Sequence, residues 1–184
     1  MRFRVYIKLF TAVLVAATAL HSCKPEESYP PTPELTFESF DKIKRENGKD
    51  SIVTLHLTFR DGDGDIGLTS QDSFPPFAYG QPYFYNLLVD FYSIENGVEK
   101  KLTSPFIVPD SLYRDTVQYH QRINNLTPEG RNKAIKGRLD LLTPFFIIDL
   151  SAGAPDSVRY KITLIDRKLN RSNQVVTPDI QLDL

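Results

Sequence analysis

Apolar and polar residues alternate along several stretches of the chain. The clearest stretch runs from Val53 to Phe59, and the same spacing recurs over 135–141 and 158–164. Successive side chains of an extended strand point to opposite faces of a sheet. This spacing therefore predicts strands that each have one apolar face and one polar face.

Further strands are predicted around a turn and toward both ends of the domain. Asn96-Gly97 lies between two β-prone segments, 84–94 and 98–103, and this pair suits a two-residue hairpin turn. No window longer than three turns shows a helical stripe. About seven strands, each with one apolar face, predict an all-β fold in which two sheets pack as an immunoglobulin-like sandwich. The remaining candidate strands are residues 34–44, 116–123 and 174–183.

Three connections are expected to meet at one end of such a sandwich, because they follow its second, fourth and sixth strands. They correspond to residues 61–83, 124–134 and 166–173. Loops held by a rigid scaffold are where binding residues usually lie. We therefore expect any ligand site at this end.

An uninterrupted apolar run of twelve residues, 9–20, follows a basic start made by Arg2, Arg4 and Lys8. A helix that crosses a bilayer needs about 20 such residues, so the run is too short to span one. The alternative, a buried helix of the folded domain, is disfavoured because the run has no polar face. We expect residues 1–22 to be a secretory signal peptide.

The only cysteine of the chain, Cys23, comes directly after this segment. A free thiol or half of a disulfide is the alternative, but no second cysteine exists to pair with it. The sequence Leu20-His21-Ser22-Cys23 resembles the lipobox of bacterial lipoproteins. The resemblance implies cleavage before Cys23, attachment of diacylglycerol and palmitate to it, and anchoring to a membrane of the cell envelope.

The segment after the cysteine is typical of a flexible tether. Residues 24–33 contain four prolines, which favour an extended conformation of about 3.1 Å per residue. We expect residues 23–33 to link the lipid to a single β-sandwich domain over 34–184. Lys24-Pro25-Glu26-Glu27 resembles the acidic export signal of Bacteroidota lipoproteins, which implies an outer-membrane location.

The charge balance argues against nucleic acid as a partner. Loss of residues 1–22 leaves 162 residues with 19 basic and 23 acidic side chains, a net charge of −4. Domains that bind nucleic acid usually carry a basic patch, and none is evident here.

An acidic loop carries the clearest chemical motif. Asp61, Asp63 and Asp65 alternate with glycines, and such a chain can wrap around calcium, which takes six to eight oxygen ligands. The spacing resembles the start of an EF-hand loop, but Ile66 stands where that loop needs glycine, and no helical pattern flanks it. A solvated turn without metal is the alternative. We expect a calcium site of another kind, whose ligands include Asp61, Asp63, Asp65, a carbonyl near Gly67, the remote carboxylate of Asp72 and, as a weaker candidate, Asp166.

Aromatic residues gather in the proline-containing segment that follows. Such side chains can stack on sugar rings or bury against a protein partner. The alternative, which we favour, is that the segment folds back and covers an edge of the sandwich, since large exposed apolar patches are uncommon. The residues concerned are Phe74, Phe77, Tyr79 and Tyr83.

The chain contains none of the catalytic motifs that carry a recognisable mechanism, such as G-x-S-x-G, H-E-x-x-H or a P-loop. Apart from His21 of the signal segment, its histidines are His56 and His120, and both fall in predicted strands. A lone strand histidine is usually structural. We therefore do not expect an enzyme.

Three longer segments carry a resemblance that covers most of the mature chain: FRDGDGDIG at 59–67, RINNLTPEGRNKAIKG at 122–137 and YKITLIDRKLNRSNQVVTP at 160–178. They resemble an uncharacterised family of Bacteroidota lipoproteins, which implies an exported sandwich but no particular activity. We expect a non-catalytic binding or accessory module. A purely structural envelope lipoprotein is the alternative, and an accessory to a glycan-active enzyme is a third.

Overall fold

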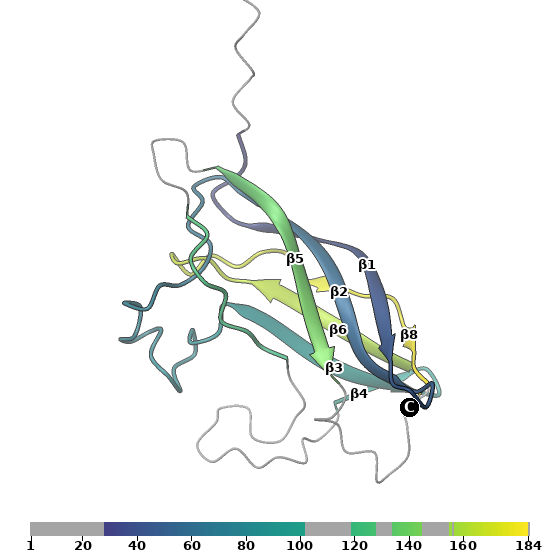
Figure 1. Ribbon diagram of the computed structural model, residues 1–184. Helices are drawn as coiled ribbons and strands as arrows, with labels where there is room; N and C mark the ends of the chain where they lie inside the picture. The colour runs from purple at the N-terminus through teal and green to yellow at the C-terminus, as the bar shows by residue number, and fades with distance from the viewer. Residues whose placement is uncertain (1–27, 102–118, 128–133, 145–154, 156, 184) are drawn as a thin grey trace, which may run out of the picture.

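A computed structural model describes residues 28–101, 119–127, 134–144, 155 and 157–183 (Figure 1). The predicted signal peptide and Cys23 lie outside these residues. Within them the chain forms strands and no helices, so no described helix is long and apolar enough to cross a membrane. The prediction of an all-β fold is confirmed.

Two antiparallel sheets make up the described part of the chain. The first contains β1 (Glu34–Lys44), β2 (Asp50–Asp61) and β5 (Ile135–Pro144), in the order β1-β2-β5. The order of the second sheet is β4-β3-β6-β7, and β8 also pairs with β6. Its strands are β3 (Leu87–Glu95), β4 (Val98–Lys101), β6 (Ser157–Leu164), β7 (Val175–Val176) and β8 (Ile180–Gln181).

The two sheets pack as a sandwich, and the core lies between them. The apolar face of β2 is turned toward the core, as predicted. Its residues Val53, Leu55 and Leu57 are fully buried in the core cluster. Strands β2, β3 and β6 supply most of that cluster. The order of the strands, with the third between the fourth and the sixth, also occurs in immunoglobulin-like sandwiches.

Aromatic side chains of the second sheet pack together in the core, and one buried threonine of the first sheet bonds to them. The rings of Phe91, Tyr119 and Tyr160 lie edge-on or tilted to one another at centroid distances of 5.3–6.0 Å. Thr143 of β5 donates a hydrogen bond to the carbonyl of Val53, so its oxygen accepts the hydroxyl proton of Tyr160 from the facing sheet at 2.8 Å. Buried polar groups need such partners, and here the pairing joins the sheets.

Two predicted strands differ from those observed. The segment 174–183 is divided into β7 and β8, because Pro178 has no N–H and the hydroxyl of Thr177 accepts the backbone N–H of Tyr160 in place of a carbonyl. The segment 84–94 becomes extended only at Leu87, where β3 begins. The described part of 116–123 extends the second sheet: Gln121 exchanges backbone hydrogen bonds with Leu87 at 2.9 and 3.0 Å.

The described parts of the three long connections meet at one end of the sandwich, as predicted. Ile66 forms a bridge with Asp166, and Leu68 forms one with Asn124. Figure 1 shows the residues that follow β2 and those around 120–127 grouped on the upper left, whereas β8 lies at the lower right. We call the upper-left end, with its residues 62–86, 122–127 and 165–173, the loop end.

Candidate metal centre

Four aspartates from both sheets converge at the loop end. Asp61 is the last residue of β2 and pairs with Ile135 of β5, which fixes its position at the end of a ladder. Asp63 and Asp65 follow in the connection, and Asp166 comes from the segment after β6. One oxygen from each of these four residues lies within 4.8 Å of the others.

This spacing suits a metal ion. Oxygens that contact calcium lie 2.3–2.6 Å from it, so two ligands on opposite sides of one ion are about 5 Å apart. The four residues, which we call the aspartate cluster, therefore bring four carboxylates into a volume that one cation can occupy. Sequence reasoning had given Asp166 a minor role, and the structure brings it into the cluster.

Several oxygens of the aspartate cluster have no hydrogen-bond donor. Asp61 is fully buried, and its Oδ2 accepts the backbone N–H of Asp65 at 3.1 Å. Its Oδ1 is buried without a partner, and so are Oδ1 of Asp63 and Oδ1 of Asp65. A buried acceptor without a donor is costly, so an inward-facing group of them favours a bound cation.

The cluster is electrostatically strained without a cation. Burial, followed by the charges of Asp63 and Asp65, raises the pKa of Asp61 to about 6. Burial, followed by the charge of Asp166, raises the pKa of Asp65 to about 6 as well. Carboxylates that share a low-dielectric site repel one another and bind protons more readily.

Lys168 lies at the solvent-exposed edge of the aspartate cluster. The Nζ of Lys168 donates a hydrogen bond to Oδ2 of Asp63 and lies 3.8 Å from Oδ2 of Asp65. The Lys168 side chain is 62% exposed, so this edge of the cluster is open to solvent. The hydrogen bond to Asp63, together with the nearby carboxylates, raises the pKa of Lys168. The side chain thus supplies one positive charge to the group.

Asp166 is held in place by a short turn. Its two carboxylate oxygens accept the backbone N–H and the side-chain amide of Asn170, both at 2.7 Å. Asp166 is buried, and its own N–H donates to the carbonyl of Asn170. These contacts fix the orientation of the carboxylate that the second sheet contributes.

Two predicted metal ligands are occupied by other groups. Oδ2 of Asp72 accepts the N–H of Thr69 at 2.7 Å and its hydroxyl at 2.8 Å, and it lies 3.9 Å from Nε of Arg167. The Thr69 N–H is the main cause that lowers the pKa of Asp72. The carbonyl of Gly67 accepts a hydrogen bond from Arg167 at 3.0 Å. The structure thus places Asp72 and the Gly67 carbonyl in a network beside the cluster.

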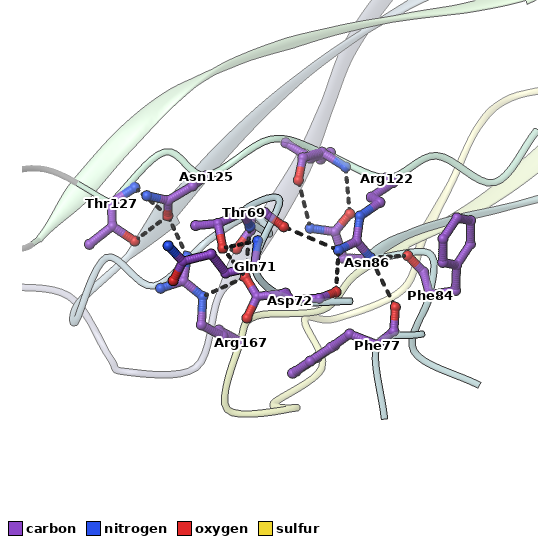
Figure 2. Close-up of polar contacts among 12 residues, drawn as sticks. Thr69, Gln71, Asp72, Phe77, Phe84, Asn86, Arg122, Asn125, Thr127 and Arg167 are labelled. Carbon is purple, nitrogen blue, oxygen red and sulfur yellow. Dashed lines mark hydrogen bonds and ion pairs between the residues drawn. The ribbon is translucent and has the colours of Figure 1, made fainter. Parts of the chain in front are cut away.

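The aromatic segment is held by a single arginine. Arg122 donates to the backbone carbonyls of Asp72 at 2.6 Å, Phe84 at 2.9 Å, Phe77 at 3.2 Å and Thr69 at 3.4 Å. Figure 2 shows the guanidinium between these carbonyls, with Arg167 and Asn125 on the far side of Asp72. The Arg122 side chain therefore links four positions of the irregular connection between β2 and β3.

Part of this segment folds back and part stays exposed. Phe84 packs edge-on against Tyr79 and Tyr85, and Tyr85 packs against His120 beside β3. Phe77 and Tyr83 are half-buried. Phe74 and Tyr79, in contrast, are 75% and 74% exposed. Of the four aromatic residues singled out in the sequence, Phe77 and Tyr83 are thus partly covered, whereas Phe74 and Tyr79 are exposed.

Sequence reasoning did not identify Arg122, Arg167 or Lys168. Arg122 belongs to the segment 122–137, and Arg167 and Lys168 belong to 160–178, but the resemblance of these segments gave none of the three a role. Each contacts residues that are 38 to 105 positions away. It also treated His56 as a lone histidine. The structure places the His56 ring between Asp140 at 2.6 Å and Asp41 at 2.9 Å, on the outer face of the first sheet.

Comparisons with known proteins add no relative: no family model, curated protein or solved structure matches the chain. The fold and the aspartate cluster therefore rest on the residues described above. They define an all-β sandwich with a cluster of four aspartates that is compatible with a metal ion.

Proposed function

We propose that the chain is an exported, lipid-anchored, non-catalytic module whose aspartate cluster holds calcium. The observation that carries the metal proposal is Oδ1 of Asp61, a fully buried carboxylate oxygen with no hydrogen-bond partner, within a group of four carboxylates. A cation at this point satisfies that oxygen and removes the repulsion among the four side chains.

Calcium fits the cluster better than magnesium does. Magnesium requires near-octahedral geometry at 2.0–2.1 Å, whereas calcium accepts irregular sets of ligands at 2.3–2.6 Å. The ligands come from two separate segments and a glycine-containing loop, and calcium accepts such an irregular set. The glycines of the loop, among them Gly64 with φ 63°, let the chain turn between successive ligands.

Both histidines in the described part of the chain have structural partners, which supports a non-catalytic role. Nδ1 of His120 accepts the backbone N–H of Val89 at 2.8 Å, so this ring belongs to the edge of β3. His56 is engaged on both ring nitrogens by Asp140 and Asp41. Neither histidine belongs to the aspartate cluster.

The metal proposal is tested by thermal unfolding of the mature chain carrying Cys23→Ser, first stripped of metal. Calcium that binds only the folded state at about 100 times Kd stabilises it by about 2.7 kcal/mol. For a domain of this size the melting midpoint rises by roughly 5–10 °C. We expect this rise with calcium and a smaller one with magnesium.

Substitutions of single aspartates show whether the rise in melting midpoint with calcium depends on the aspartate cluster. Asp61→Asn and Asp63→Asn keep the size of the side chain but remove a charged ligand, so the rise with calcium is lost. Asp72→Asn is the matched control, because Asp72 belongs to the same loop but bonds to Thr69 outside the cluster. A midpoint that calcium leaves unmoved in the wild-type chain contradicts the proposal.

The lipid anchor is tested separately in a bacterial host that processes lipoproteins. Labelling with a palmitate analogue and recovery in the membrane fraction are expected for the wild-type chain and lost for Cys23→Ala. The support is the position of the only cysteine, directly after a signal-like run. Labelling that survives the substitution refutes the anchor.

A further inference from the structure

The chain enters the folded domain beside the aspartate cluster. The N–H of Gly62 donates to the carbonyl of Pro30 at 2.8 Å. A Cβ atom on Gly62 would lie only 2.0 Å from the carbonyl oxygen of Tyr29, so the two segments are in direct contact. Gly62 lies between Asp61 and Asp63, and the last residues before β1 are therefore packed against the loop end (Figure 1).

This contact limits how far the loop end can lie from Cys23. Pro30 is the seventh residue after Cys23, and an extended chain spans at most about 3.6 Å per residue. Pro30, and with it the contact at Gly62, therefore stays within about 25 Å of Cys23. The opposite end, where Asp50 bonds to Asp183, lies about 40 Å from this contact, because the twelve-residue β2 separates them.

The loop end carries two exposed aromatic side chains, and hydrogen bonds hold the backbone of their segment. Phe74 and Tyr79 are the most exposed large hydrophobic residues in the described part of the chain. Arg122 fixes the backbone of their segment through its four carbonyl contacts. Arg171, which is exposed, belongs to the same end, and its guanidinium carbon lies 6.0 Å from the ring centre of Tyr83.

We propose that Phe74 and Tyr79 dock onto the lipid–water interface of the membrane that carries the anchor. This inference rests on the proposed lipid at Cys23. Aromatic side chains favour the boundary between headgroups and acyl chains, where an apolar ring is buried and a polar tip stays hydrated. The short tether to Gly62, the exposed rings and the neighbouring Arg171 favour this surface over a soluble partner.

Docking would also give the protein a second contact with the membrane besides the acyl chains. Docking would fix the orientation of the domain on the membrane. The loop end would face the bilayer, and the turn at 45–49 with the C-terminal strand β8 would face away. The calcium of the proposed function would then lie in the membrane-proximal half of the domain and stiffen the loop that carries the docking residues.

The test uses the full chain, lipidated in a bacterial host and reconstituted into vesicles of phosphatidylethanolamine and phosphatidylglycerol. Cys23 is the only cysteine and is blocked by lipid, so one added cysteine can be labelled specifically. Gln81→Cys places a fluorophore in the aromatic segment, and Glu46→Cys places it in the turn at the opposite end. Both positions are exposed.

With quencher-labelled lipids we expect at least a twofold greater loss of fluorescence at position 81 than at position 46. Adding Phe74→Ala and Tyr79→Ala should reduce the value at 81 to that at 46. Equal quenching at both positions, or quenching at 81 that survives the double substitution, overturns docking by these rings. A change in fluorescence at position 81 that appears only at a high density of chains indicates contact with a second copy of the chain. That result also overturns docking onto the membrane.

Failure of the anchor gives a different result. A chain that does not float with the vesicles lacks the lipid, and both the anchor and the docking are then refuted. If the chain floats with the vesicles but the two probes are quenched equally, the anchor is supported and the docking is refuted. The calcium proposal is independent of both results, because its test uses the unlipidated Cys23→Ser chain.

Discussion

Lys168 donates a hydrogen bond to Asp63 from a position 105 residues later in the sequence. The ammonium group occupies the solvent-facing side of the aspartate cluster, where a divalent cation would have to enter. A lysine at this point both neutralises the metal-free cluster and competes with a metal for it. The relationship leads to the first prediction.

Lys168→Met should have opposite effects on the metal-free and calcium-bound protein. Without metal the melting midpoint falls, because the carboxylates lose their positive neighbour. Calcium affinity, measured by titration calorimetry, rises roughly two- to fivefold, the range expected for removal of an exposed ion pair. Lys100→Met removes a lysine that is similarly exposed and lies 3.8 Å from Glu95, and it should leave calcium affinity unchanged. Equal affinities in wild type and Lys168→Met would show that the lysine does not compete.

His56 should make stability depend on pH. Hydrogen bonds to Asp140 and then to Asp41 raise the pKa of His56 above its ordinary value of 6.5. The folded state therefore binds a proton more tightly than the unfolded chain does, and the stabilisation is fully present below pH 6.5. It is lost as the pH rises through the folded-state pKa.

The measurement is urea unfolding of the wild type and of His56→Gln between pH 5 and pH 9. The difference in unfolding free energy should be largest at the acidic end and should shrink as the pH rises. Comparing the two proteins at each pH cancels the titration of the aspartate cluster. A difference that stays constant over this range would mean that His56 keeps one charge state.

Neighbouring leucines of β5 should respond differently to the same change. Leu141 is 1% exposed and Leu142 is 51% exposed, because successive side chains face opposite sides of the sheet. Leu141→Ala should cost about 2–5 kcal/mol of unfolding free energy by leaving a cavity. Leu142→Ala should cost about 0.5 kcal/mol or less. Similar losses measured by denaturant unfolding would show that the assigned faces are wrong.

Gly67 should not tolerate a side chain. Its φ is +91°, and an added Cβ would lie 2.1 Å from the backbone oxygen of Asn124. Gly48 has a similar φ of +81° but nothing within 4 Å of an added Cβ. Gly67→Ala therefore adds a backbone clash to the strain of a left-handed conformation, and its melting midpoint should fall well below that of Gly48→Ala. Equal midpoints would refute the close contact between the two loop segments.

Arg122→Lys should loosen the aromatic segment while leaving the sandwich folded. Lysine keeps the charge but lacks the planar set of donors that reaches carbonyls on both sides of the loop. Hydrogen exchange over residues 72–84 should become faster, and exchange in β2 and β6 should not change. Arg138→Lys, at an exposed arginine of β5, is the control. Unchanged exchange in the segment would show that other contacts hold it.

The sequence by itself determined the strands and most of their faces. Period-two alternation is a local property, because neighbouring side chains of a strand must point in opposite directions whatever it packs against. It located β2 and β6 and their buried residues correctly. It also located the turn at Asn96-Gly97, where both residues have positive φ, at 51° and 77°. The candidate metal site could also be identified from local sequence, because three of its four carboxylates lie within five consecutive residues.

The tertiary structure decided which residues complete the site. Asp166 and Lys168 join the loop at 61–65 only because β2 and β6 end on the same side of the sandwich, each in a different sheet. Asp72 is nearer in sequence, yet its carboxylate is taken by Thr69 before it can reach the cluster. Arg122 is likewise joined to its carbonyls by the packing of two connections. Contacts of this kind depend on where strand ends meet in space, and no local pattern of residues records that.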